Sequence, residues 1–321
     1  TGGMLLAQRP TGIIMALVVV VIALIVQSIP AAMQMLIEIG VARSQGVAPN
    51  IGTVGTLDGA AAVITLLSFG LATLWIWFWM AKKEHRRFST LGFTKPRAGL
   101  ITAGRGALIG VGMLAICVLV PVIFGQAQLA WAAPDASSWG MIVIMLIGFM
   151  VQGSTEEILT RGYLTQAVAR RWGLVAAVII QALFFMLIHG ANPGMGVLPI
   201  INLIAFAIFG TFLSLAEGGL WGICAMHGAW NWAQGNLFGV AVSGNPLSDT
   251  AFTFTAHEGS ADLLTGGAFG IEGSLVTTVV FAGAAVICWR IWRKSATAAA
   301  ANTQAAPITQ ASTEQALSTE P

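Results

Sequence analysis

The sequence predicts an all-α, polytopic membrane protein with about eight transmembrane helices and both termini in the cytoplasm. Of its 321 residues, 56% are hydrophobic and only 9% are charged, whereas a soluble domain carries about a quarter charged residues. Apolar runs of about 20 residues recur along the chain, which is the length that a helix needs to cross a bilayer. Lysine and arginine gather in alternate loops, which is typical of a multi-pass protein.

The predicted spans are eight apolar segments, at 12–37, 59–81, 106–124, 139–170, 173–189, 197–216, 220–242 and 274–292. Pro30 lies inside the first span, where neighbouring helices can satisfy the carbonyl that it frees. The fourth segment is longer than a bilayer requires, so we expect one long helix that continues past Glu156 and Arg161 as far as Arg170.

Basic residues decide the predicted orientation. Seven lysines and arginines lie between Lys82 and Arg105, so this loop is predicted to be cytoplasmic, and alternation places the loops at 38–58, 125–138, 190–196 and 243–273 outside. These outer loops contain a single basic residue, Arg43. No basic patch with interleaved aromatic residues is present, so we expect the lipid bilayer and no nucleic acid as a partner.

The composition divides the chain into three parts. Residues 1–11 form an N-terminal segment, and residues 12–294 form a transmembrane domain whose functional core is expected at about 139–242. Residues 295–321 are rich in Ala, Thr, Gln and Ser, and we predict a disordered cytoplasmic tail. The short loops favour a bacterial cell membrane as the location.

A few ionisable side chains lie inside the predicted spans, where such residues are rare and usually functional. Glu156 and His189 lie at similar heights above the turn that joins the fourth and fifth spans, roughly 22–26 Å from it, so we expect them to meet. With three amides added to the ionisable residues, the full set is Glu156, Glu157, Arg161, His189, His227, Asn202, Asn231 and Gln234.

Helical spacing separates the roles of these residues. Glu157 and Arg161 are i, i+4 and can form an ion pair, which leaves Glu156 on another face. His227, Asn231 and Gln234 share one stripe of the seventh span. Phe185 lies one turn before His189 and is expected to wall the site.

This set of residues suits water activation. A glutamate in a cavity of low dielectric can act as a general base, and a neighbouring histidine can orient or share its proton. A second histidine with an asparagine one turn away offers donors for a developing oxyanion. Glu156, His189 and His227 could instead hold a catalytic zinc ion, although no H-E-x-x-H motif is present.

Three motifs carry a resemblance to a known family. E-E-x-x-x-R occurs at Glu156, Glu157 and Arg161, F-x-x-x-H at Phe185 and His189, and H-x-x-x-N at His227 and Asn231. In this order, each on a predicted membrane helix, they resemble the CPBP family, also called Abi: CAAX-type prenyl proteases and bacteriocin-processing or immunity proteins. The resemblance covers roughly residues 139–242 and extends to "LLTGGAFGIEGS" before the last span.

The resemblance implies an intramembrane endopeptidase that acts on a membrane-associated peptide or protein without a favoured cofactor. It implies that Glu156 activates water, that His189 assists, and that His227 and Asn231 form the oxyanion hole. Glu157 and Arg161 would support the site. Zinc is the cofactor alternative.

Other readings of the same residues stay open. The protein could be a non-catalytic immunity or scaffold protein that keeps the cavity, or a proton- or ion-coupled transporter that uses the buried carboxylates. At individual positions, the glutamate–arginine cluster could only pin helices, His189 could be an interfacial residue, and His227 with Asn231 could be interhelical hydrogen-bonding glue. Gln234 and Asn202 are expected to be such glue.

Overall fold

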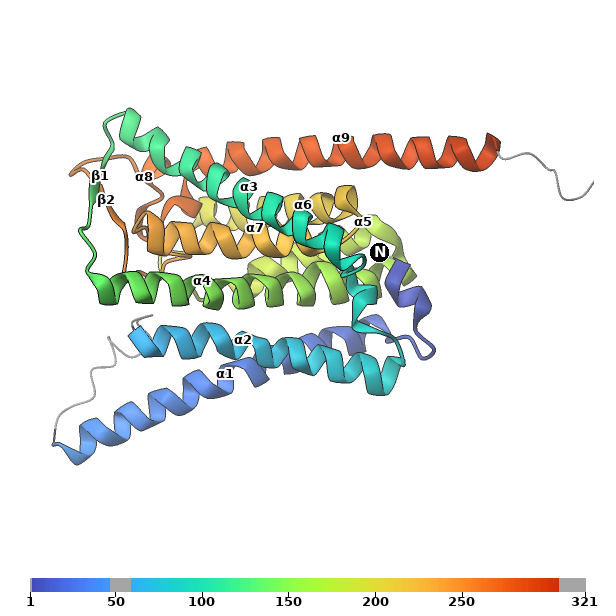
Figure 1. Cartoon of the computed structure of the whole chain (residues 1–321), viewed down its shortest axis with the longest axis horizontal. Coiled ribbons are helices and arrows are strands. Elements are labelled where there is room, and N and C mark those ends of the chain that lie inside the picture. The colour runs from blue at the N-terminus through green and yellow to red at the C-terminus, as the bar shows by residue number, and fades with distance from the viewer. Residues whose placement is uncertain (1, 47–58, 306–321) are drawn as a thin grey trace, which may run out of the picture.

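The computed structural model describes residues 2–46 and 59–305, and these form a bundle of helices (Figure 1). The α-helices are α1 (Ile13–Ser44), α2 (Gly59–Trp79), α3 (Pro96–Ile123), α4 (Ala136–Glu157), α5 (Thr165–Ile188), α6 (Val197–Glu217), α7 (Trp221–Trp232), α8 (Asp262–Thr265) and α9 (Leu275–Ala305). Two strands, β1 (Ala127–Trp131) and β2 (Phe252–Ala256), pair antiparallel. π-Helical turns follow α2, α4 and α7, at Met80–Glu84, Ile158–Leu164 and Ala233–Leu237.

The predicted fold class is confirmed. Among the described residues, six helical stretches are long and apolar enough to cross a membrane: Ile13–Ser44, Gly59–Glu84, Pro96–Ile123, Ala136–Ile188, Val197–Glu217 and Leu275–Ala298. The 53-residue stretch bends at Gly173, whose φ of 80° and ψ of 174° are not helical. It therefore contains both the fourth and the fifth predicted segments, while α7 is too short to be counted alone. The number of eight spans stays a prediction.

The loops sort to two ends of the bundle. The N-terminus, the connection between α2 and α3 and the C-terminal half of α9 lie at one end in Figure 1, and β1, β2 and α8 lie at the other. The first end holds the basic loop that the sequence places in the cytoplasm. The side of the membrane on which each end lies stays a prediction that rests on charge.

The centre of the bundle is α7, which lies between α3 and α4 (Figure 1). Most of its side chains are buried, including those of Met226, His227 and Trp230. Gly106 and Gly110 of α3 face its backbone so closely that a Cβ at either position would clash with a carbonyl of α7. Small residues thus let the two helices pack tightly, as is common in membrane bundles.

Helices α1 and α2 form a pair on one side of the bundle. The first half of α1 carries buried residues up to Gln27, whereas residues 31–44 contain no buried side chain. In Figure 1 this second half leans away from the other helices. The change occurs near Pro30, which lies inside the helix and removes a backbone donor there.

An anchoring cluster of buried polar residues ties the N-terminal segment to this pair and to α5. Glu84 is fully buried and accepts hydrogen bonds from the Thr11 hydroxyl, from the Tyr163 hydroxyl at 3.1 Å and from the Arg86 Nε. Arg86 Nη1 donates in turn to Gln166 Oε1 at 2.8 Å. These five residues are called the anchoring cluster below.

The predicted disordered tail needs a correction at its start. Residues 295–305 continue α9 to Ala305, because this segment is rich in alanine, the best helix former. The low apolar content of this segment predicts that it does not pack against the rest of the protein. A helix that continues from a preceding span can form without such packing. The rest of the predicted tail lies outside the described residues.

Candidate active site

The site begins where α4 ends. Glu156 and Glu157 are the last residues of α4, and the chain continues directly into the π-helical turn Ile158–Leu164. The Thr160 hydroxyl donates to the Glu156 carbonyl at 2.6 Å, and the Thr165 hydroxyl donates to the Thr160 carbonyl at 2.8 Å. These side chains satisfy backbone carbonyls around the altered turn, a feature that recurs at functional sites.

Two glycines bring α7 against α4 at the same height. A Cβ on Gly153 would lie 2.6 Å from the Gly228 backbone nitrogen, and a Cβ on Gly228 would lie 2.8 Å from the Phe149 carbonyl. Larger residues would therefore force the helices apart. Since Gly228 follows His227 directly, this contact places the histidine beside the glutamates.

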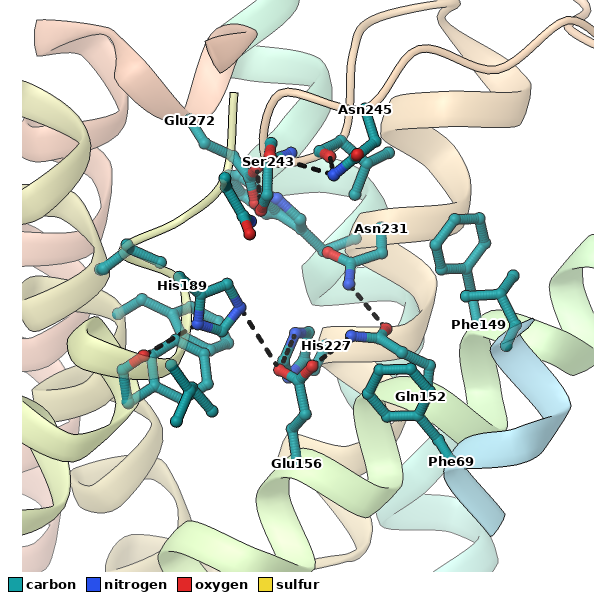
Figure 2. Close-up of a pocket in the computed structure, with 18 of the residues that line it drawn as sticks. Phe69, Phe149, Gln152, Glu156, His189, His227, Asn231, Ser243, Asn245 and Glu272 are labelled. Atoms are coloured by element: carbon teal, nitrogen blue, oxygen red, sulfur yellow. Dashed lines mark hydrogen bonds and ion pairs between the residues drawn. The ribbon is translucent and has the colours of Figure 1, made fainter. Parts of the chain in front are cut away.

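Glu156 has one occupied and one free carboxylate oxygen. Its Oε1 accepts a hydrogen bond from Gln152 Nε2 at 2.6 Å, and Gln152 Oε1 accepts one from Asn231 Nδ2 at 2.9 Å. Its Oε2 is buried without a hydrogen-bond partner and lies 3.8 Å from the Nε2 atoms of both His189 and His227. The three side chains converge on this oxygen in Figure 2.

Both histidines are oriented by their other ring nitrogen. His189 Nδ1 lies 2.8 Å from the Phe185 carbonyl, which can only accept, so Nδ1 carries the proton and Nε2 faces Glu156. His227 Nδ1 lies 2.8 Å from Glu157 Oε1 and donates to that carboxylate. With Nδ1 as this donor, His227 Nε2 faces Glu156 Oε2, and it can donate a hydrogen bond only when the ring carries both protons.

Glu157 also holds Arg161. Arg161 Nη1 donates to Glu157 Oε1 at 3.1 Å, which confirms the i, i+4 ion pair that the spacing predicts. The guanidinium lies 4.5 Å from the centre of the Phe185 ring and 5.2 Å from that of Phe206. Two aromatic faces thus stabilise a fully buried cation whose Nε and Nη2 have no hydrogen-bond partner.

A cavity of about 540 Å³ lies in front of these groups, within the usual range for ligand sites. Glu156, His189, His227 and Asn231 line it together with residues of α1 and α2. Figure 2 shows Glu272, Ser243 and Asn245 at one end of the cavity. Aromatic residues form much of the remaining wall, namely Phe69, Phe149, Phe185, Phe206, Trp230, Phe269 and Phe281.

The zinc alternative requires Glu156, His189 and His227 as ligands. Among residues 2–46 and 59–305, no group of three or more His, Cys, Asp or Glu side chains is arranged so that it could hold a metal ion. One Glu156 oxygen is already bonded to Gln152. Only Oε2 of this carboxylate is therefore free for a ligand, and the zinc alternative stays a prediction.

The structure brings together the four residues predicted for chemistry and the three predicted to support them. Gln152 was missed, although its position one turn before Glu156 in an apolar run was a signal that could have found it. Gln234 and Asn202 hold the segment before α9: Gln234 Nε2 donates to Glu272 Oε2 at 3.2 Å, and Asn202 Nδ2 donates to the Ser274 carbonyl at 2.8 Å. Asn202 also lines the cavity.

Comparison with known proteins gives one family. The family described as type II CAAX prenyl endopeptidase Rce1-like matches residues 138–233, from the first turn of α4 to just past α7. All seven residues of the three motifs lie within this region, so the match confirms the resemblance to CAAX-type proteases. No curated protein and no solved structure gave a significant match.

Proposed function

We propose that the protein, whose residues 138–233 match the Rce1-like family of type II CAAX prenyl endopeptidases, hydrolyses peptide bonds within the membrane by water activated at Glu156. The observation that carries the proposal is the free Oε2 of Glu156. This oxygen is buried at the wall of the cavity, and two imidazole nitrogens face it at 3.8 Å. That spacing is too long for direct hydrogen bonds and leaves room for a water that bridges the groups.

In the proposed first step, this water attacks the carbonyl carbon of the scissile peptide bond, and its proton passes to Glu156 Oε2. His189 Nε2 accepts a hydrogen bond from the same water and orients it, because its Nδ1 is fixed as a donor to Phe185. Gln152 holds the other Glu156 oxygen, so the carboxylate keeps its free oxygen toward the cavity. General-base catalysis of this kind contributes about 10²–10⁴-fold.

The tetrahedral intermediate carries a negative charge on the former carbonyl oxygen. Asn231 has one amide hydrogen bonded to Gln152, and its second hydrogen can reach this oxygen. His227 also lines the cavity, with Nδ1 held by Glu157, and its Nε2 can donate to this oxygen when the ring carries both protons. Glu156 then returns its proton to the leaving amine, the carbon–nitrogen bond breaks, and a carboxylic acid and an amine are released.

Glu157 and Arg161 have a supporting role in this scheme. Neither lines the cavity, so neither is expected to touch the substrate. Their ion pair fixes the position of Glu157, and Glu157 in turn sets the orientation of His227.

Terminal-peptide proteomics tests the proposal. Membranes from cells that express the wild-type protein should contain new peptide termini that are absent with the Glu156→Gln protein. Equal sets of termini would contradict the proposal and favour a non-catalytic immunity or scaffold role, which complementation by Glu156→Gln would then support. The same comparison identifies the substrate and shows whether it is prenylated.

Exhaustive chelation tests the mechanism separately. The purified protein should keep its activity after chelation and should carry no stoichiometric zinc by elemental analysis. Loss of activity that zinc restores would replace the glutamate mechanism with a metal-dependent one.

A further inference from the structure

Gln27 of α1 is a buried amide without a partner for its oxygen. It lies inside a helix of 32 residues, its side chain is only 9% exposed, and its Oε1 forms no hydrogen bond. A buried amide that lacks its hydrogen bond destabilises the folded protein. Its position therefore needs an explanation beyond packing.

Gln27 lines the same cavity as Glu156. Leu24 and Ser28 lie beside it on α1, and the Ser28 hydroxyl is already bonded to the Leu24 carbonyl at 2.8 Å. The cavity is thus lined by the proposed catalytic residues of α4, α5 and α7 and by α1, which offers one amide with an unbonded oxygen.

We propose that Gln27 binds the main chain of the substrate in the cavity that Glu156 also lines. A primary amide presents one acceptor and two donors, which complement the N–H and C=O of a single peptide unit. A substrate in a helix uses these groups within its own backbone, so the bound segment is extended. This assignment rests on the proposed function and makes α1 part of the substrate-binding site.

The test uses internally quenched apolar peptides made from the cleavage sites that the termini comparison identifies. Each peptide is paired with a set of depsipeptides in which an ester replaces one peptide unit other than the scissile one, which removes a single N–H donor. With the wild-type protein, one ester position should lower kcat/KM about tenfold, the effect of one lost hydrogen bond. Gln27→Leu should lower kcat/KM for the parent peptide about tenfold and should abolish the additional effect of that ester.

Gln34→Leu is the matched control. Gln34 lies two turns further along α1, outside the cavity lining, and donates to Glu38 Oε1 at 3.0 Å. It should leave kcat/KM and the ester effect unchanged. Thermal unfolding in detergent should show Gln27→Leu to be at least as stable as the wild type, because the substitution removes an unpaired buried amide.

Two outcomes would overturn the assignment. The first is a kcat/KM for the parent peptide that Gln27→Leu leaves unchanged. The second is a tenfold loss of kcat/KM in Gln27→Leu that is equal for the parent peptide and for every ester peptide. If Gln27→Leu behaves in either way while Glu156→Gln is inactive, only the assignment of Gln27 fails. If Glu156→Gln cleaves the peptides as well as the wild type, the proposed function fails and the assignment fails with it.

Discussion

Glu84 and Glu156 are both buried carboxylates, yet their surroundings differ in kind. Both oxygens of Glu84 are bonded, to Thr11 and Tyr163 on one side and to Arg86 on the other. Glu156 has one oxygen bonded and the other free beside two imidazoles. The anchoring cluster does not line the large cavity, whereas Glu156 does.

This difference separates a structural carboxylate from a chemically available one. A buried charge whose partners occupy all its oxygens stabilises one arrangement of the chain and has no lone pair directed at a ligand. A buried charge with a free oxygen at a cavity wall is costly for stability and is available for proton transfer. Substitutions in the two clusters should accordingly affect different measurements.

The largest expected effect is on catalysis. Glu156→Gln should lower kcat about 10³-fold, since an amide cannot accept the proton from water. Thermal unfolding in detergent should show no loss of stability, because the neutral side chain keeps the bond from Gln152 if its amide is oriented suitably. A large loss of stability would place Glu156 with Glu84 as a structural group.

The next effect is on stability. Glu84→Ala should lower the free energy of unfolding by about 3 kcal/mol, because it leaves the buried Arg86 cation without its carboxylate. The fraction that stays folded should cleave a peptide substrate with a kcat close to that of the wild type. A fall in kcat per folded molecule comparable to that of Glu156→Gln would break the distinction between the clusters.

Two glutamines allow a closer comparison. Gln152→Leu should lower kcat about tenfold with little change in KM, because it uncouples Glu156 from Asn231. Gln166→Leu removes a partner of Arg86 and should lower the melting temperature without changing kcat. The same pattern of changes in both variants would show that the two glutamines have one role.

The smallest effect concerns a single hydroxyl. Tyr163→Phe removes one donor to Glu84 and should lower the free energy of unfolding by about 1 kcal/mol. The Thr11 and Arg86 bonds to the same carboxylate remain, so the loss should be smaller than for Glu84→Ala. Denaturant unfolding of Tyr163→Phe and Glu84→Ala measures both losses of unfolding free energy and therefore gives their ratio.

The polar motif positions could be predicted from the sequence because each is a polar residue in an apolar helix. Equal distance from a shared turn was enough to predict that Glu156 meets His189, and i, i+4 spacing was enough for Glu157 and Arg161. The bond between Glu157 and His227 was not predicted, since it depends on the crossing of α4 and α7 at Gly153 and Gly228. Gln27 was missed for the same reason: which face of α1 meets the cavity follows from packing that its uniformly apolar sequence does not encode.

The anchoring cluster was missed for another reason. Glu84 and Arg86 lie in a stretch rich in charge, "KKEHRR", which is typical of a solvated loop. Both are buried because the N-terminal segment folds over them, with Met4 fully enclosed and Thr11 bonded to Glu84. A contact between distant parts of the chain left no local signal in the sequence.

The π-helical turn after Glu157 changes the phase of the helix. Residues at i and i+7 of an α-helix lie on nearly the same face, and Glu156 and Tyr163 have this spacing. Nevertheless Glu156 lines the cavity while Tyr163 points to Glu84. Bonds from i to i+5 in Ile158–Leu164 insert one extra residue into the turn, so a single helix can serve two clusters that face different directions. Deleting one residue from this turn would let it close as an α-helix and would keep the direction of the tyrosine, because a residue six positions after Glu156 in an α-helix lies about 120° around the axis from it.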